Sequence, residues 1–192
     1  MKGWKIFALI GLVLGGLASN FLPIGTELME NLTLAPVSLE SPTPIILEPE
    51  RLIIEKIGIN AIVEKVGLTE NKAMDVPKEK MNVAWYELGN KPGETGSAVI
   101  AGHYDWYDGA AVFFKLNSLE KGDVIETVDT NGQREKFSVT DKALYKNEEF
   151  PISLVFSRRD KKRLNLITCD GIFNRQSDAY NEKLVIFSEA IE

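Results

Sequence analysis

Short runs rich in β-branched and aromatic residues recur along the chain from residue 51 onward, and turn-forming residues separate them. Such runs are typical of β-strands, whose pleated surface suits branched and aromatic side chains. No long segment repeats its apolar residues at the helical period. We therefore expect a mainly β domain, either a closed barrel or a sandwich. The expected strands cover residues 51–57, 61–66, 97–102, 123–128, 135–145, 164–169 and 183–190.

Two local patterns refine this expectation. The Asn-Gly pair at 131–132 separates two of the runs and favours a hairpin with a type I′ turn, because both residue types tolerate a positive φ. The stretch 109–119 predicts a short helix or turn that packs Val112, Phe113 and Leu116 inward. Both patterns fit the mainly β prediction.

The composition is that of an ordinary globular protein. Of the 192 residues, 44% are hydrophobic and 26% are charged, which suits one domain plus an appendage. The net charge of -6 and the pI near 5.0 argue against a general nucleic-acid binder, which presents a basic face to the phosphates. Nucleic acid is therefore not expected as a partner.

The N-terminus carries a long uncharged stretch. No charged residue lies between Lys5 and Glu27, and at helical rise this stretch reaches the roughly 30 Å thickness of a bilayer's hydrocarbon core. We expect residues 1–25 to form a membrane anchor. Lys2 and Lys5 precede the apolar run and acidic residues follow it, so the N-terminus is expected in the cytoplasm and the rest outside the cell.

A cleaved signal peptide is the alternative, because small residues near Ala18 suit a peptidase. The uncleaved anchor is favoured, since the apolar stretch exceeds the ~7–15 residues of the apolar region in a usual signal peptide. Residues 26–50 are rich in proline, which favours an extended stalk. The predicted organisation is an anchor, this stalk, and a folded domain over residues 51–192.

The chain has one cysteine, Cys169, and one histidine, His103, and each lies where a β-rich run meets a turn. A single cysteine excludes an internal disulfide. A neighbouring imidazole can convert a thiol into a nucleophilic thiolate, so the two residues are candidates for a catalytic pair. The alternative is a buried structural cysteine and an unrelated surface histidine. Gly102 and Gly171 favour the catalytic interpretation, because they would let a substrate approach both residues closely.

Several motifs occur in a fixed order around these two residues. They are Trp85-Tyr86, Pro92-Gly93-Glu94, the Ala-Gly-His that ends at His103, Phe113-Phe114, Gly122-Asp123 and the Thr168-Cys169 pair. Together they closely resemble the sortases, most of all the compact classes called F and E. The resemblance covers roughly residues 51 to 190.

The resemblance implies an eight-stranded β-barrel with one or two short helices behind an N-terminal transmembrane helix. It implies a transpeptidase that acts on secreted proteins with a C-terminal LPxTG-like sorting signal. Cys169 would form the thioester, and His103 would pair with the thiolate or transfer protons. An amine of a peptidoglycan precursor would resolve the thioester. No cofactor is implied, and the enzyme would act outside the cell from a single-pass anchor.

Sortases also use an arginine to bind the substrate and to stabilise the oxyanion. After Cys169 the only arginine is Arg175, which lies closer to the cysteine than the family arginine does. Lys183 lies nearer the expected position, but an ammonium lacks the planar two-donor geometry of a guanidinium. We expect Arg175 to take the role, with Lys183 as the alternative.

Four further residues are candidates for substrate binding. Thr168 and Gly102 adjoin the predicted catalytic pair, and Asp105 could orient the imidazole through a hydrogen bond. Trp106, with Trp85 and Tyr107, could form an apolar wall for the leucine and proline of a sorting signal. Each has a structural alternative: Thr168 favours strands, Asp105 suits a turn, and Trp85 suits a core.

The basic run at 157–163 precedes the cysteine strand. It is either a solvated loop or, as its place beside the groove in sortases implies, a contact for anionic cell-wall polymer or lipid head groups.

Two other functions remain open from the sequence. An L,D-transpeptidase has a glycine and a histidine before its cysteine, which this chain lacks. A membrane-tethered binding module without catalysis is the second alternative. One His and one Cys supply only half of a tetrahedral metal shell, and the acidic loops lack EF-hand spacing, so no metal site is expected.

Overall fold

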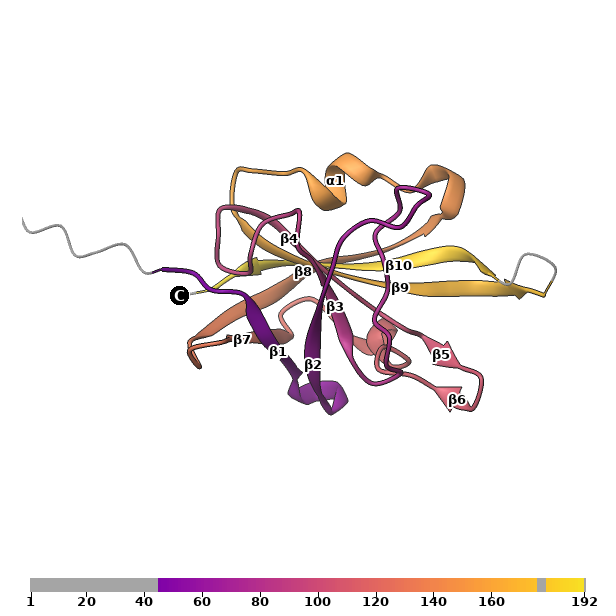
Figure 1. Cartoon of the computed structure of the whole chain (residues 1–192), viewed down its shortest axis with the longest axis horizontal. Helices are drawn as coiled ribbons and strands as arrows, with labels where there is room; N and C mark the ends of the chain where they lie inside the picture. Colours follow the sequence, from indigo (N-terminus) through magenta and orange to yellow (C-terminus); the bar gives the residue numbers. More distant parts are fainter. Residues whose placement is uncertain (1–44, 176–178, 192) are drawn as a thin grey trace, which may run out of the picture. The chain divides into compact units, whose positions relative to one another are not determined.

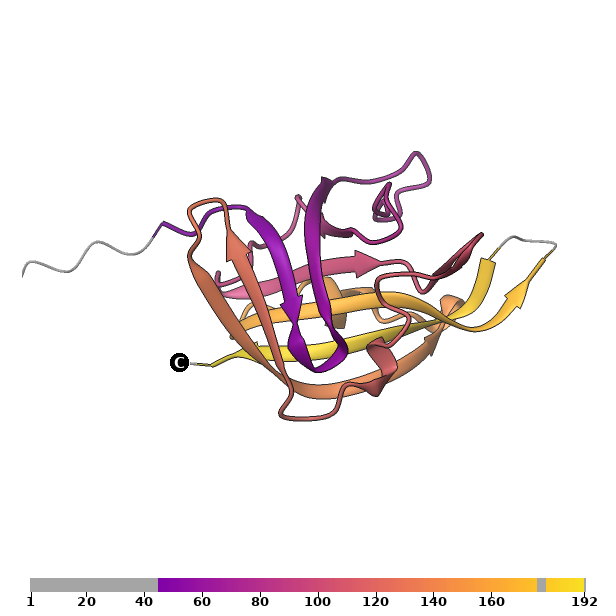
Figure 2. The same ribbon diagram turned by 90° about the horizontal axis from the view of Figure 1, so that it is seen from below.

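Eight strands close into a barrel in the computed structural model, which describes residues 45–175 and 179–191 (Figures 1 and 2). Around the barrel their order is β1, β2, β3, β4, β9, β10, β8, β7. The barrel strands are β1 (Pro49–Ile54), β2 (Ile59–Val66), β3 (Val83–Tyr86), β4 (Gly96–Gly102), β7 (Val124–Asp129), β8 (Arg134–Lys146), β9 (Lys162–Asn174) and β10 (Ala179–Ala190).

The remaining elements are short. Outside the barrel, β5 and β6 form a separate two-stranded hairpin, and the one α-helix in the described part of the chain, α1, precedes β9. The bounds are β5 (Asp105–Trp106), β6 (Gly109–Ala110), α1 (Ile152–Phe156) and the 3-10 helices Glu55–Ile57, Leu116–Ser118 and Asn147–Glu149.

Most neighbouring strands are antiparallel, but two pairs are parallel, β2 with β3 and β4 with β9. The β4–β9 pairing matters most for the site. Two neighbours in a parallel pair run in the same direction, so they deliver the residues that follow both strands to the same end of the barrel. His103 follows β4, and Cys169 lies in the second half of β9.

The barrel interior is filled by large aliphatic and aromatic side chains that alternate with outward-facing residues along the strands. Val112, Phe113 and Leu116 are at most 5% exposed, which confirms that the stretch 109–119 packs inward. The other fully buried large side chains of the core include Leu52, Ile54, Ile100, Leu119, Ile125, Phe137, Leu164, Leu166, Leu184 and Ile186.

A second apolar cluster lies outside the barrel, under α1. Val155 of α1 packs there with Ile167 of β9 and Val185 of β10. The buried Asn165 side chain donates a hydrogen bond of 2.6 Å to the carbonyl oxygen of Val155. These contacts fix α1 against the strand that carries the cysteine.

The mainly β prediction and most of the expected strands are confirmed, and the barrel is the form they take. The short strand β3 was missed. The hairpin at 131–132 is present, but the type I′ prediction is wrong: Gly132 has a φ of 80°, whereas Asn131 has no positive φ. Asp129 instead accepts hydrogen bonds of 2.9 Å from the backbone of Asn131 and Gln133. A carboxylate thus organises the turn.

The predicted anchor and most of the predicted stalk lie outside the described residues. The described part begins at residue 45, and β1 begins at Pro49, two residues before the expected start of the domain. A proline is tolerated at the first position of a strand. Within residues 45–175 and 179–191, no helix is long and apolar enough to span a bilayer.

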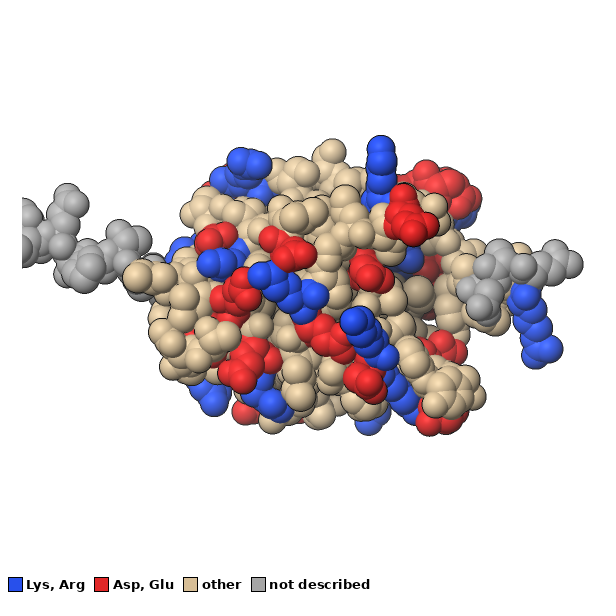
Figure 3. Space-filling view, viewed as in Figure 1, with Lys and Arg blue, Asp and Glu red and all other residues tan. Residues whose placement is uncertain are grey.

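Acidic and basic side chains are interspersed on the face of the domain shown in Figure 3. Arg163 differs from these surface charges, because its side chain is only 4% exposed. Its guanidinium donates two hydrogen bonds to Asp160, of 2.6 and 2.9 Å, and one to Glu189 of 3.2 Å. This ion pair network ties the start of β9 to the end of β10.

The hydrogen bonds from Arg163 lower the pKa of Asp160 from its ordinary value of 3.8 to about 2. A carboxyl with a lowered pKa stabilises the fold above its unfolded pKa and loses that contribution as the pH falls toward the folded pKa. We predict that Asp160→Asn lowers the free energy of unfolding by a constant amount from pH 7 down to about 4. Below about pH 4 the difference from the wild type should shrink.

Urea unfolding of the full chain between pH 7 and pH 2.5 measures this difference. Glu148→Gln, at an exposed position, is the matched control and should change little at any pH. A difference for Asp160→Asn that stayed constant through the acid range would contradict the role of the ion pair.

Candidate active site

The register of three neighbouring strands places three functional side chains in one row. In the parallel β4–β9 pair Ala101 lies opposite Ile167, so His103 and Cys169 follow two residues later in both segments. The buried Thr168 hydroxyl donates a hydrogen bond of 2.9 Å to the carbonyl of Gly102, the last residue of β4, so the two strands stay in contact up to the residue before His103.

On the other side of the cysteine strand, Lys183 of β10 lies directly opposite Cys169. Neighbouring strands are about 4.8 Å apart, and residues in register point to the same face of a sheet. The three residues thus form a row, with His103 directly after β4, Cys169 on β9 and Lys183 on β10. We call it the catalytic row; all three side chains are half-buried.

All three residues of the catalytic row line one cavity of about 760 Å³. This volume falls within the range of ligand-binding clefts. Its lining includes residues of the loop between β2 and β3 and residues of α1 and its flanks. The apolar lining residues are Leu68, Met74, Val76, Tyr86, Leu88, Phe150, Ile152, Phe156 and Ile167.

The groove presents apolar surface to solvent. Val76, Leu88 and Ile152 are between 52% and 67% exposed. Exposed apolar residues gathered around a cleft mark a site for an apolar ligand or partner.

His103 is held by contacts on two sides. Its Nε2 lies 2.8 Å from the carbonyl oxygen of Pro77, and its ring meets Trp106 edge to face at a centroid distance of 4.7 Å. A carbonyl oxygen only accepts hydrogen bonds, so Nε2 must carry the proton. In the neutral ring Nδ1 is therefore the nitrogen that can accept a proton.

Lys183 supplies a positive charge beside the thiol. Its Nζ lies 4.0 Å from the Cys169 sulfur. Cys169 has no disulfide partner.

Arg175 does not line the groove. It directly follows β9, is exposed, and lies six residues beyond Cys169, which is roughly 20 Å along an extended strand. Of the two cations weighed from the sequence, the structure brings Lys183 and not Arg175 to the cysteine.

The other candidates are divided between the groove and its surroundings. Thr168 and Gly102 line the groove, and an added Cβ on Gly102 would lie 2.5 Å from the buried Phe113 ring. Gly102 is thus also needed for packing. Asp105 accepts a hydrogen bond of 2.6 Å from the Tyr180 hydroxyl. Trp106 packs on His103.

Trp85 and Tyr107 do not line the groove either. Trp85 is 3% exposed in the barrel core and donates a hydrogen bond of 3.0 Å to the Asn90 carbonyl, whereas Tyr107 is 93% exposed. The basic run at 157–163 is divided in the same way. Arg159 lines the groove, and Arg163 is buried in its ion pair network.

Sequence reasoning missed several residues that shape the site. The groove loop, residues 72–76, carries no motif. The Pro77 carbonyl could not be identified from the sequence either, because every residue type has a backbone acceptor. The α1 wall had only a weak signal, the apolar residue types at Phe150, Ile152 and Phe156. Tyr180 had none.

The non-catalytic binding module weighed from the sequence would be favoured by a sealed thiol or by a histidine on the other side of the barrel. The structure shows neither, since Cys169 and His103 line the same groove. Within the described residues, no group of three or more His, Cys, Asp or Glu side chains could hold a metal ion.

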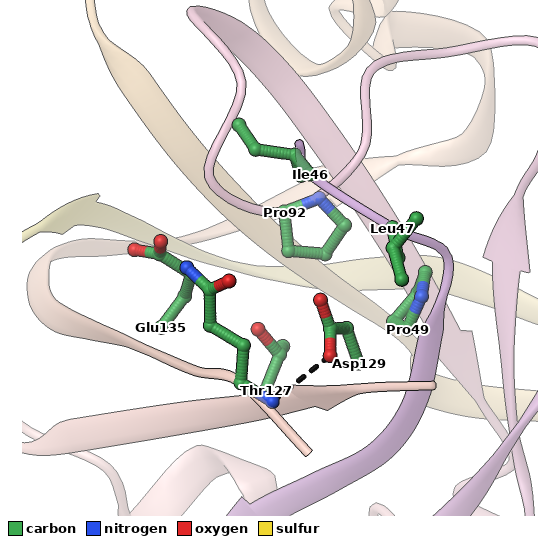
Figure 4. A pocket seen from close by; sticks show the side chains of 8 residues that line it. Ile46, Leu47, Pro49, Pro92, Thr127, Asp129 and Glu135 are labelled. Atoms are coloured by element: carbon green, nitrogen blue, oxygen red, sulfur yellow. Dashed lines mark hydrogen bonds between the residues drawn. The ribbon is translucent and has the colours of Figure 1, made fainter. Parts of the chain in front are cut away.

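A second, much smaller pocket lies where residues 46–49 meet the β7–β8 hairpin (Figure 4). Its volume of about 10 Å³ is about that of a single water molecule. The backbone N–H of Gln133 donates to Asp129 at its edge. This pocket is too small for a substrate, so the large groove is the candidate site.

Solved sortase structures share this fold. Sortase C-1 from Actinomyces oris is 23% identical with a TM-score of 0.59, and the match covers 74% of this chain and 73% of that one. The lid mutant of sortase A from Corynebacterium diphtheriae is 17% identical with a TM-score of 0.59, covering 80% and 73%. The sortase D5 transpeptidase from Clostridium perfringens is 21% identical with a TM-score of 0.56, covering 76% and 79%.

Comparison with curated protein sequences gave no match. The sequence model of the family described as "Sortase domain", however, matches residues 52–191, which is most of the chain and all of the barrel except the first three residues of β1. With its lone cysteine and lone histidine brought together in one groove, this chain belongs to the sortase family of cysteine transpeptidases.

Proposed function

We propose that this chain is a sortase-like transpeptidase that cleaves an LPxTG-like sorting signal through a thioester on Cys169 and transfers the cleaved protein to an amine. The observation that carries the proposal is the catalytic row, in which an imidazole and an ammonium flank a half-buried thiol at the floor of an open groove.

In the first half-reaction the Cys169 sulfur attacks the carbonyl carbon of the scissile peptide bond. A C–S bond forms, and the carbonyl oxygen becomes an oxyanion. His103, protonated, then gives its proton to the leaving amine as the C–N bond breaks. The products are a thioester on Cys169 and a peptide with a free amino group.

In the second half-reaction an incoming amine attacks the thioester carbonyl. Neutral His103 takes the proton that the amine loses, a new C–N bond forms, and the C–S bond breaks. The Cys169 thiolate is regenerated beside the His103 imidazolium. No redox step occurs, and no external proton donor is needed over the full cycle.

Lys183 is the best placed cation for the oxyanion and the thiolate. It lies in register with Cys169, on the side opposite His103. A fixed positive charge beside developing negative charge stabilises a transition state most where water is partly excluded. An ammonium offers a point charge without a fork, so we expect a looser hold on the substrate carbonyl than a guanidinium gives.

The groove walls suit the aliphatic part of the sorting signal. Leu68, Val76 and Ile152 offer apolar surface in the groove, which fits the leucine and proline of an LPxTG-like peptide. The acceptor is proposed to be the amine of a peptidoglycan precursor, and the subclass to be F or compact E.

The location of the enzyme is a proposal from the sequence. The uncharged N-terminal stretch and the flanking charges support a single-pass anchor with the N-terminus in the cytoplasm. Residues 26–50 would then hold the domain outside the cell, where secreted substrates pass.

We predict that the full chain, purified in detergent and incubated with a library of sorting-signal peptides, forms a thioester adduct on Cys169. Mass spectrometry of the intact protein and of its peptides detects the adduct. Cys169→Ala should form none, and His103→Ala should slow its formation by about 10²–10⁴-fold, because proton transfer is lost.

An adduct on Cys169→Ala at the wild-type level would contradict the assignment of the nucleophile. Turnover of Cys169→Ala in the same assay would contradict it equally.

The second prediction separates the two candidate cations. Lys183→Met should lower kcat/KM by about 10²–10³-fold, since removal of an oxyanion-stabilising group has effects of this size. Arg175→Met should change it less than threefold, because Arg175 does not line the groove. Steady-state kinetics with one accepted peptide measure both variants, and Lys183→Arg should retain most of the activity. A larger loss in Arg175→Met than in Lys183→Met would refute the role of Lys183.

A further inference from the structure

We propose that Tyr180 and Asp105 form a tether that positions His103 over the cysteine, and that both are positioning residues for acyl transfer. The inference rests on the proposed function of the catalytic row, and it concerns two side chains that do not line the groove.

The tether joins the two segments that flank the row. Asp105 lies two residues after His103, in the short β5–β6 hairpin, and Tyr180 lies three residues before Lys183, near the start of β10. The Tyr180 hydroxyl donates a hydrogen bond of 2.6 Å to Asp105 Oδ2. Two segments that are 75 residues apart in the chain are thereby connected beside the site.

A chain of aromatic rings reinforces this connection. The Tyr180 ring contacts Tyr104 at a centroid distance of 5.7 Å and Phe173 of β9 at 5.2 Å. Tyr104, the residue after His103, also contacts Phe114 at 5.1 Å. These distances lie in the range of favourable aromatic pairs. Tyr104, the residue next to the imidazole, is thus packed between the rings of Tyr180 and Phe114.

The segment after His103 depends on such contacts because it is not part of the barrel. β5 and β6 have two residues each and pair only with one another, and an isolated hairpin of this size is not stable alone. Figures 1 and 2 show this hairpin beside the distal ends of β9 and β10. On its other side Asp108 forms an ion pair of 2.5 Å with Lys80.

The chemistry of the pair suits a permanent contact. Its hydrogen bond to Asp105 raises the pKa of Tyr180 to about 12, so the hydroxyl remains a donor throughout the physiological range. A hydrogen bond to a charged acceptor is also stronger than one between neutral groups. Without it, the segment that starts at His103 would keep only the ring contact between Tyr104 and Tyr180 as its link to β10.

The test uses variants that remove one partner at a time from the full chain in detergent. Tyr180→Phe deletes the hydroxyl but keeps the ring contacts, and Asp105→Ala deletes the acceptor. Tyr107→Phe is the matched control, because this tyrosine lies on the same hairpin, is 93% exposed and has no hydrogen-bond partner among the described residues.

Two readouts separate positioning from general stability. His103 is the only histidine of the chain, so the imidazole gives one resolved Cε1–H signal in an NMR spectrum of the full chain. Tyr180→Phe and Asp105→Ala should each shift or broaden this signal, and Tyr107→Phe should leave it unchanged. In steady-state kinetics both variants should lower kcat about tenfold with KM within twofold, since misplaced groups slow chemistry more than binding.

The double variant decides whether the two residues act through one contact. It should lose about tenfold in kcat, like each single variant, because both changes break the same hydrogen bond. A loss of about a hundredfold would show independent effects and would overturn the proposal. An unchanged His103 signal in both single variants would overturn it as well. If the wild type itself proves inactive, the proposed function fails and the His103 signal alone tests the tether.

Discussion

The parallel pairing of β4 with β9 is the constraint on which the site depends. His103 and Cys169 are 66 residues apart in sequence, as are Gly102 and Thr168, whose hydrogen bond closes the pairing at the site. A parallel pair needs a long crossover between its strands. Here the crossover contains β7, β8 and α1, so the same connection that allows the pairing also supplies one wall of the groove.

The barrel gives this pairing its rigidity. The strands β9 and β10, which carry Cys169 and Lys183, have hydrogen-bonded neighbours on both sides, and so does β4, which ends one residue before His103. Ile100, Leu166 and Leu184 point inward from these strands into the core. The outward-facing positions of the same strands are then available for the residues of the site. Cys169 and Lys183 stand on strands rather than loops, and groups placed in this way hold their geometry better through a two-step reaction.

Much of the fold and the two most reactive residues could be predicted from the sequence. Cys169 and His103 were identifiable because each is the only residue of its kind and each lies at the end of a β-rich run. The choice between Arg175 and Lys183 could not be made by counting, because the β9–β10 register shifts between Tyr180 and Glu182. A bulge of this kind changes which residue faces the cysteine. The partner of Asp105 was likewise hidden, since a contact across 75 residues has no local signal.

A disulfide trap tests the central claim, the spatial register of the row, most directly. A His103→Cys variant of the full chain would place two thiols in neighbouring positions of adjacent strands, within the Cα separation of about 4.4–6.8 Å that a disulfide requires. After mild oxidation, thiol counting and peptide mass spectrometry should find a bond between residues 103 and 169, and the account predicts that it forms readily. Two free thiols at these positions under the same oxidation would contradict the register, and with it the site built on it.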